Sequence, residues 1–91
     1  MTTEIVWSNE EVRQLLSDEF NGGKLMPRSR YNRWKRAALV SRCKLFGYRE
    51  LAKLKFVGEQ LPRFKRLATV KDLLVKELEN NEDAFNPPRE S

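Results

Sequence analysis

Glycine and proline residues divide this chain into stretches of about one helix length each, and this spacing constrains the fold more than any other feature. The dividing residues are Asn21-Gly22-Gly23, Pro27, Gly47 and Pro62. Glycine ends helices because it adopts the left-handed conformation at little cost, and proline lacks the amide hydrogen that a helix interior needs. The spacing therefore predicts an all-α fold, a small bundle of about four helices.

The first helix is predicted to begin after Ser8. Ser8 and Glu11 have the Ser-x-x-Glu spacing of a capping box, which satisfies two backbone amides that the helix itself leaves without partners. The apolar residues that follow recur at helical spacing, and they are Val12, Leu15, Leu16 and Phe20. Asn21-Gly22-Gly23 is predicted to end this helix.

The second helix is predicted over residues 30–46, with Ser29 as its cap and Gly47 as the residue that ends it. One face at the helical period is predicted to pack inward, and it carries Tyr31, Trp34, Ala37, Ala38, Ser41 and Leu45. The opposite face carries Arg33, Arg36, Val40 and Lys44.

The stretch that precedes Pro62 is compatible with two interpretations. Its leucines have helical spacing, whereas Leu54-Lys55-Phe56-Val57 alternates as a short strand does. We favour a helix over residues 48–57, with Pro62 breaking whatever precedes it. In the other interpretation a short two-stranded element forms from residues 4–7 and 53–57.

The last helix is predicted to begin at Thr69 and Asp72, which have capping-box spacing, and to end at Asn80-Asn81. The residues after it are acidic, contain two adjacent prolines and offer one phenylalanine to the core. We therefore predict a single helical domain over residues 1–81 and a mobile acidic tail over residues 82–91.

At 91 residues the chain has room for one hydrophobic core and little room for an enclosed active-site cavity. The residues predicted to share the core are Trp7, Val12, Leu16, Tyr31, Trp34, Ala38, Leu51, Leu54, Leu73 and Leu74. The sequence contains no histidine, which removes the commonest general base and the commonest metal ligand. We therefore expect no enzyme, no metal site and no cofactor.

Cys43 is the only cysteine, so neither an internal disulfide nor a cysteine metal cluster can form. The sequence contains no apolar run long enough for a signal peptide or a membrane helix. These features predict a cytoplasmic protein in a reducing compartment, without a membrane partner.

The basic side chains concentrate in the middle of the chain. Residues 24–66 carry a net charge of +12, whereas residues 1–23 carry −4 and residues 67–91 carry −3. Such asymmetry is typical of a protein that binds phosphate groups. The other interpretation is that the acidic ends fold back and neutralise the basic middle.

The stretch from Arg28 to Arg36 interleaves basic and aromatic residues. Arginine neutralises phosphates and offers a planar group that matches a phosphate or a guanine edge. The aromatics Tyr31 and Trp34 share a face with Ala38, so we expect them to pack inward. The residues predicted to bind nucleic acid are Arg28, Arg30, Arg33, Arg36, Lys44, Arg63, Lys65 and Arg66.

Part of the chain, residues 48–67, resembles the helix-turn-helix of MerR-type regulators and excisionases. The motifs that carry the resemblance are Glu50-Leu51-Ala52-Lys53, Val57 and Arg63-Phe64. The chain departs from these families at Phe56, where they usually have glycine at the turn, and at Pro62, which falls within the second helix. The resemblance implies that the DNA groove or phosphates would be contacted by Arg63, Lys65 and Arg66.

These features together predict a small nucleic-acid-binding protein that neutralises phosphates through its central basic segment. Double-stranded DNA is favoured slightly over RNA. The alternative is a protein–protein adaptor whose basic surface docks an acidic protein.

Overall fold

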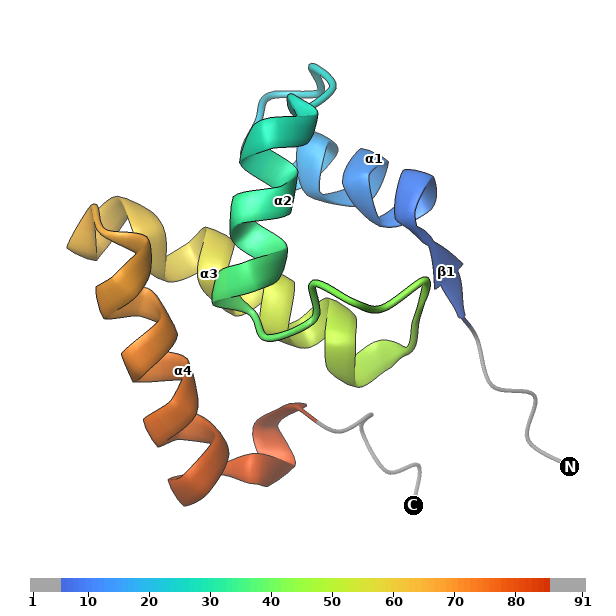
Figure 1. The fold of residues 1–91 in the computed structure, drawn as a ribbon. Coiled ribbons are helices and arrows are strands. Elements are labelled where there is room, and N and C mark those ends of the chain that lie inside the picture. The colour runs from blue at the N-terminus through green and yellow to red at the C-terminus, as the bar shows by residue number, and fades with distance from the viewer. Residues whose placement is uncertain (1–5, 86–91) are drawn as a thin grey trace, which may run out of the picture.

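The computed structural model describes residues 6–85, and these residues form a small helical bundle with a short antiparallel strand pair (Figure 1). The elements in chain order are β1 (Trp7–Ser8), α1 (Asn9–Phe20), α2 (Arg28–Ala37), β2 (Leu45–Phe46), α3 (Tyr48–Phe64), α4 (Leu67–Asn80) and the 3-10 helix η1 (Glu82–Phe85). The predicted fold class is therefore confirmed, including the short two-stranded element.

The capping box at the start of α1 is confirmed. The Ser8 hydroxyl accepts a hydrogen bond from the Glu11 amide at 3.3 Å, and the Glu11 carboxylate accepts one from the Ser8 amide at 3.2 Å. The helix ends at Phe20, before Gly22 and Gly23 take positive φ angles of 61° and 84°. Both ends of α1 lie where the sequence predicts them because its start is capped by its own side chains and its end by glycine.

The predicted second helix is wrong at both ends. Helix α2 begins at Arg28, with Pro27 rather than Ser29 at the cap position, and it ends at Ala37 rather than residue 46. The ending has the hydrogen bonds of a Schellman motif, in which the Val40 amide donates to the Lys35 carbonyl at 2.9 Å. Leu39 takes the left-handed conformation there, with φ of 63°.

Leaving the helix early places apolar residues in the core that a longer helix would expose. Val40, predicted on the polar face, is only 2% exposed, and Phe46 is fully buried. Ser41 and Leu45, predicted to pack inward, are exposed. Burial of Val40 and Phe46 outweighs the backbone strain at Leu39, because each buried side chain contributes about 1.5–3 kcal/mol against a left-handed penalty of about 1–2 kcal/mol.

The strand pair joins different residues from those predicted. Trp7 pairs with Phe46 and Ser8 with Leu45, whereas residues 53–57 lie within α3. Residues 4 and 5 of the predicted first strand lie outside the described residues. Gly47, predicted to end a helix, instead precedes α3, and its amide donates to the Glu50 carboxylate at 3.2 Å.

Helix α3 is confirmed over residues 48–57 but continues to Phe64, through Pro62. Pro62 lies two residues before the end of α3, so its missing amide hydrogen removes one helical hydrogen bond close to the end of the helix. Helix α4 begins at Leu67, so Thr69 lies inside the helix and does not cap it. Leu67 is partly buried against the core, which favours the earlier start.

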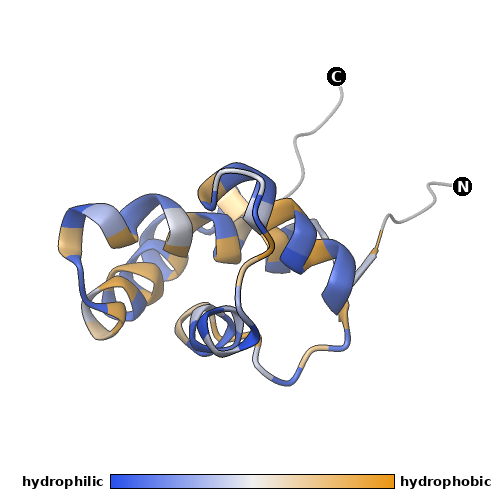
Figure 2. Cartoon of the chain, turned by 90° about the horizontal axis from the view of Figure 1, so that it is seen from above, coloured by the Kyte–Doolittle hydropathy of each residue, from blue (hydrophilic) through white to orange (hydrophobic). Residues whose placement is uncertain are grey.

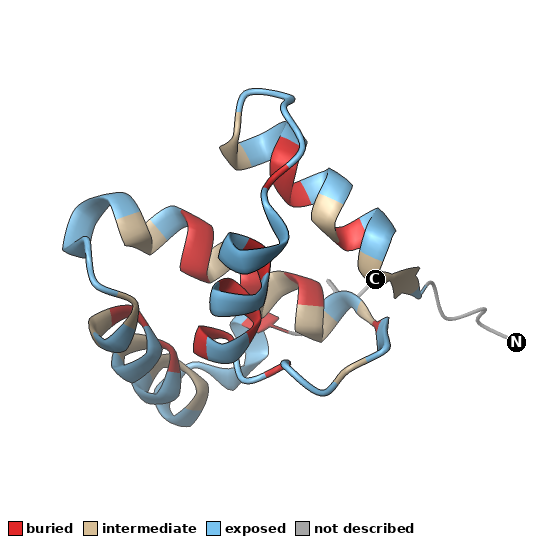
Figure 3. Ribbon diagram, turned by 45° about the horizontal axis from the view of Figure 1, so that its top comes forward, coloured by how far each residue is buried: buried red, intermediate tan, exposed pale blue. Residues whose placement is uncertain are grey.

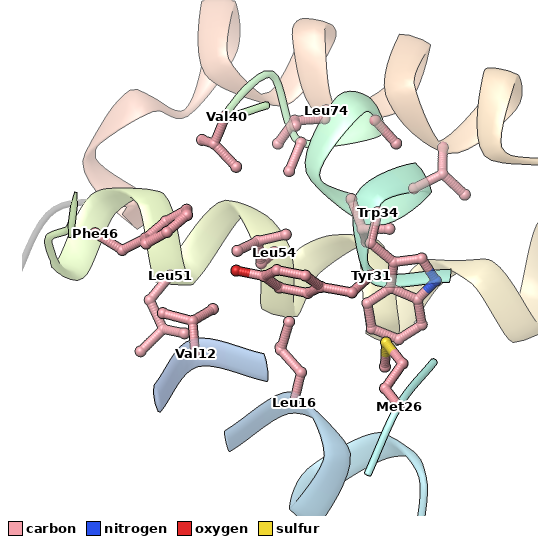
Figure 4. Close-up of a cluster of buried hydrophobic side chains, with 14 of the residues drawn as sticks. Val12, Leu16, Met26, Tyr31, Trp34, Val40, Phe46, Leu51, Leu54 and Leu74 are labelled. Carbon is pink, nitrogen blue, oxygen red and sulfur yellow. The ribbon is translucent and has the colours of Figure 1, made fainter. Parts of the chain in front are cut away.

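The core lies between the four helices and β2 (Figure 3). Figure 4 shows Tyr31 and Trp34 pointing from α2 into the apolar cluster, as predicted. Trp7 is partly buried against this core, and all the other predicted core residues except Leu73 are buried within it. Leu73 is only half-buried, whereas its neighbour Leu74, also predicted to lie in the core, is fully buried.

Residues 82–85 belong to the folded domain. Phe85 at the end of η1 is only 3% exposed, and its ring packs edge to face against Phe56 with 5.8 Å between centroids. The predicted boundary after residue 81 therefore moves beyond Phe85, because this ring completes the core beside α3. Residues 86–91 of the predicted tail lie outside the described residues.

Polar contacts fix α2 against α1. The Asn9 side-chain oxygen accepts hydrogen bonds from the Tyr31 hydroxyl at 2.9 Å and the Lys35 ammonium at 3.0 Å. The Lys35 ammonium also lies over the rings of Tyr31 and Phe46, at 5.3 Å and 5.7 Å from their centroids. Since this buried cation is satisfied by an amide oxygen and two ring faces, the inner face of α2 is fixed and its arginines project outward.

Candidate nucleic-acid interface

The arginines of helix α2 face the solvent because the opposite face of the helix packs in the core. Tyr31, Trp34 and Ala38 are buried, whereas Arg33 and Arg36 are exposed on the opposite side of the helix. Figure 2 shows hydrophobic and hydrophilic residues interleaved along the helices, as amphipathic packing requires.

The start of α2 is held in place by two hydrogen bonds to α1. The Met26 amide donates to the Ser17 hydroxyl, and the Met26 carbonyl accepts from the Arg13 side chain, both at 2.7 Å. Met26 is fully buried. The position of Pro27 and of the first turn of α2 is therefore fixed by the body of the protein.

All eight predicted binding residues are exposed. Within residues 6–85, none of them forms a salt bridge; the ion pairs there involve other basic residues, as in Arg49–Glu82 and Lys55–Glu19. The acidic first helix thus contributes one ion pair, from Glu19, and leaves the predicted residues without carboxylate partners in the described part of the chain.

A groove of about 500 Å³ brings three of the eight residues together. Arg30 and Arg33 come from α2, and Lys65 comes from the connection between α3 and α4. The groove is also lined by Ser29 of α2 and by four apolar residues, Pro27, Trp34, Leu61 and Leu67. The groove is therefore lined by both cationic and apolar side chains.

Lys65 reaches the groove in a conformation that lysine rarely adopts. Its φ is 58°, in the left-handed region, and its amide donates to the Leu61 carbonyl at 2.7 Å to end α3. Glycine is the usual residue at such a position, because a Cβ there costs about 1–2 kcal/mol. The sequence gives no signal for this conformation.

Arg30 is held from two sides. Its guanidinium lies over the Trp34 ring at 5.7 Å from the centroid, and one of its nitrogens donates to the Asn21 side-chain oxygen at 3.3 Å. Trp34 in turn packs edge to face with Phe20, at 5.6 Å between centroids. Arg30 is therefore the best positioned of the three cations that line the groove, since no such side-chain contact is seen for Arg33 or Lys65 among the described residues.

The other predicted residues do not line the groove. Arg28 and Arg36 lie in the first and last turns of α2, while Arg63 and Arg66 lie on either side of Lys65. Lys44 lies on the connection from α2 to β2, which Figure 1 shows on the far side of α2 from the α3–α4 connection. Lys44 is thus separate from the groove.

The turn that the helix-turn-helix resemblance places near Phe56 is not present, because residues 48–64 form one continuous helix. Comparisons of the chain with protein families, with curated proteins and with solved structures found no match.

Neither a metal site nor a membrane-spanning helix is seen within residues 6–85. No group of three or more histidine, cysteine, aspartate or glutamate side chains is placed there to hold a metal ion. No helix in this part of the chain combines the length and the apolar character needed to cross a bilayer.

Proposed function

We propose that this protein binds nucleic acid through the groove of Arg30, Arg33 and Lys65, with the neighbouring arginines as further phosphate contacts. One observation carries the proposal: cations from separate parts of the sequence line one groove, and no carboxylate in residues 6–85 is paired with them. A phosphate that enters therefore displaces no internal ion pair, and its binding releases condensed counterions.

The first test is fluorescence anisotropy with labelled nucleic acids across a salt series. Affinity is expected to fall steeply as salt rises, because each neutralised phosphate releases counterions. The double variant Arg30→Ala with Arg33→Ala is expected to bind roughly tenfold more weakly at low salt. Its slope of log affinity against log salt is expected to fall by about 2.

The matched control is the double variant Arg42→Ala with Lys76→Ala, which removes the same charge at two exposed positions outside the groove. This control should bind almost as the natural sequence does. Equal losses in the two double variants would show that net charge and not the groove determines binding. Absence of binding to DNA and RNA at low salt, with a folded protein, would favour the adaptor function instead.

Lys65 allows binding and stability to be separated. Lys65→Gly is expected to raise the free energy of unfolding by about 1 kcal/mol, since glycine adopts φ of 58° without a Cβ clash. The same variant is expected to weaken binding and to lower the salt slope by about 1. Urea denaturation and anisotropy measure the two effects.

Lys65→Ala is the control for this variant, because it removes the ammonium and keeps the strained backbone. It should lose affinity as Lys65→Gly does, without the gain in stability. A destabilised Lys65→Gly protein would contradict the left-handed conformation at this position.

A further inference from the structure

The side chains that line the groove indicate which form of nucleic acid it would bind. A duplex presents its phosphates on a convex surface, and its bases are stacked and paired inside. Exposed arginines alone would suffice to bind such a surface. An apolar wall made of Pro27, Leu61 and Leu67 contributes only if an apolar group of the ligand enters the groove.

The aromatic residues of α2 cannot themselves stack on a base. Tyr31 is 4% exposed and Trp34 is 2% exposed, so their ring faces are covered by the protein. The planar groups that are available are the guanidiniums of Arg30 and Arg33, both exposed on the groove, and Arg30 is the one that is held in place, with its guanidinium 5.7 Å from the centroid of the Trp34 ring. Guanidinium planes stack on unpaired bases in proteins that bind single strands.

Arg30 also needs little ordering before it stacks. The Trp34 ring and the Asn21 side-chain oxygen already restrict it, so less side-chain entropy is lost on binding. Arg33 and Lys65 lie on the same groove and supply the charges for the phosphates that flank the base. The volume of about 500 Å³ falls within the range of pockets that hold small organic groups.

We infer that the groove holds one unpaired nucleotide, whose base stacks on Arg30 and whose phosphates meet Arg33 and Lys65, so that the protein binds a single strand in preference to a duplex. This inference rests on the proposed function and names its ligand. It departs from the expectation from sequence, which favoured duplex DNA, because the sequence does not show the apolar wall beside the cations.

The test compares labelled oligonucleotides of about 12 nucleotides, a length within the range of single-strand site sizes. The probes are an unstructured DNA strand, an RNA strand of matching sequence, a DNA hairpin duplex, and a DNA strand whose central nucleotides are abasic. The single strands are expected to bind about tenfold more tightly than the duplex. The abasic strand keeps every phosphate and should lose most of that advantage.

Arg30→Lys is the matched variant, since it keeps the charge and removes the plane. It is expected to bind natural and abasic strands with nearly equal affinity, whereas Arg33→Lys should keep the preference for the natural strand. Circular dichroism verifies that both variants fold. Whichever of the DNA and RNA strands binds more tightly shows which sugar the groove prefers. Either preference agrees with an unpaired nucleotide in the groove.

The outcomes separate this inference from the proposed function. Equal binding of natural, abasic and duplex probes would overturn the nucleotide site and leave phosphate binding intact. A preference for natural strands that persists in Arg30→Lys would also overturn it, since the base would then stack elsewhere. No binding to any probe at low salt would overturn the proposed function and, with it, the inference.

Discussion

Leu74→Ala is expected to lower the free energy of unfolding by about 2–5 kcal/mol, because its side chain is fully buried and its removal leaves a cavity. The same change at the neighbouring Leu73 is expected to cost about 1 kcal/mol, since Leu73 is only half-buried. Urea denaturation of the two variants measures the difference. In a domain this small, the first loss would unfold a large part of the population.

The pair of leucines also tests the orientation of α4. Both side chains have the same composition and lie in the same helix, so helix propensity and hydrophobicity cancel in the comparison. A larger cost at Leu73 than at Leu74 would mean that α4 is rotated relative to the core, and similar costs would contradict the difference in burial between the two side chains.

The second large effect is expected at alkaline pH. Burial raises the pKa of the Tyr31 hydroxyl from 10.0 to about 12, with the nearby Arg13 acting in the opposite direction. The folded state holds the Tyr31 proton more tightly than the unfolded state does. The free energy of unfolding is therefore unaffected by the titration of this group below pH 10 and falls between pH 10 and 12. The expected loss is about 2–3 kcal/mol of unfolding free energy.

Tyr31→Phe isolates the effect of this hydroxyl from other effects of alkaline pH. The variant should be less stable by about 1 kcal/mol near neutral pH, because it lacks the hydrogen bond to Asn9, and it should lose less stability between pH 10 and 12. Tyr48→Phe is the control, since Tyr48 is 43% exposed. Urea denaturation at pH 9 and 12 compares the three proteins; parallel losses in all three would contradict the burial of Tyr31.

The features that the sequence predicts correctly depend on local chemistry. The capping box of Ser8 and Glu11 and the glycines after Phe20 determine both ends of α1 without help from the rest of the chain. The helical period likewise identifies Tyr31 and Trp34 as inward-facing, and both are buried.

The features that the sequence does not predict depend on contacts between distant segments. The end of α2 is decided by the burial of Val40 and Phe46, which a local pattern cannot weigh against the strain at Leu39. Gly47 suits either a helix end or a helix start, and only the pairing of β2 with β1 settles which one applies.

The candidate site divides in the same way. Its basic residues are identified from composition and spacing, and each is exposed. Their grouping in one groove is not identified from the sequence. Arg30 and Lys65 come together only through the full length of α3 and the left-handed turn that follows it. The conformation of Lys65 breaks the rule that glycine occupies such positions, so no propensity argument would place the turn there.

The shape of the groove also depends on a residue that carries no side chain. A Cβ at Gly58 of α3 would lie 2.7 Å from the Phe20 ring, so only glycine leaves room for that ring. Phe20 packs against Trp34, and Trp34 supports Arg30. A related protein could therefore keep every basic residue of this chain and still present a differently shaped groove, if position 58 held any other amino acid.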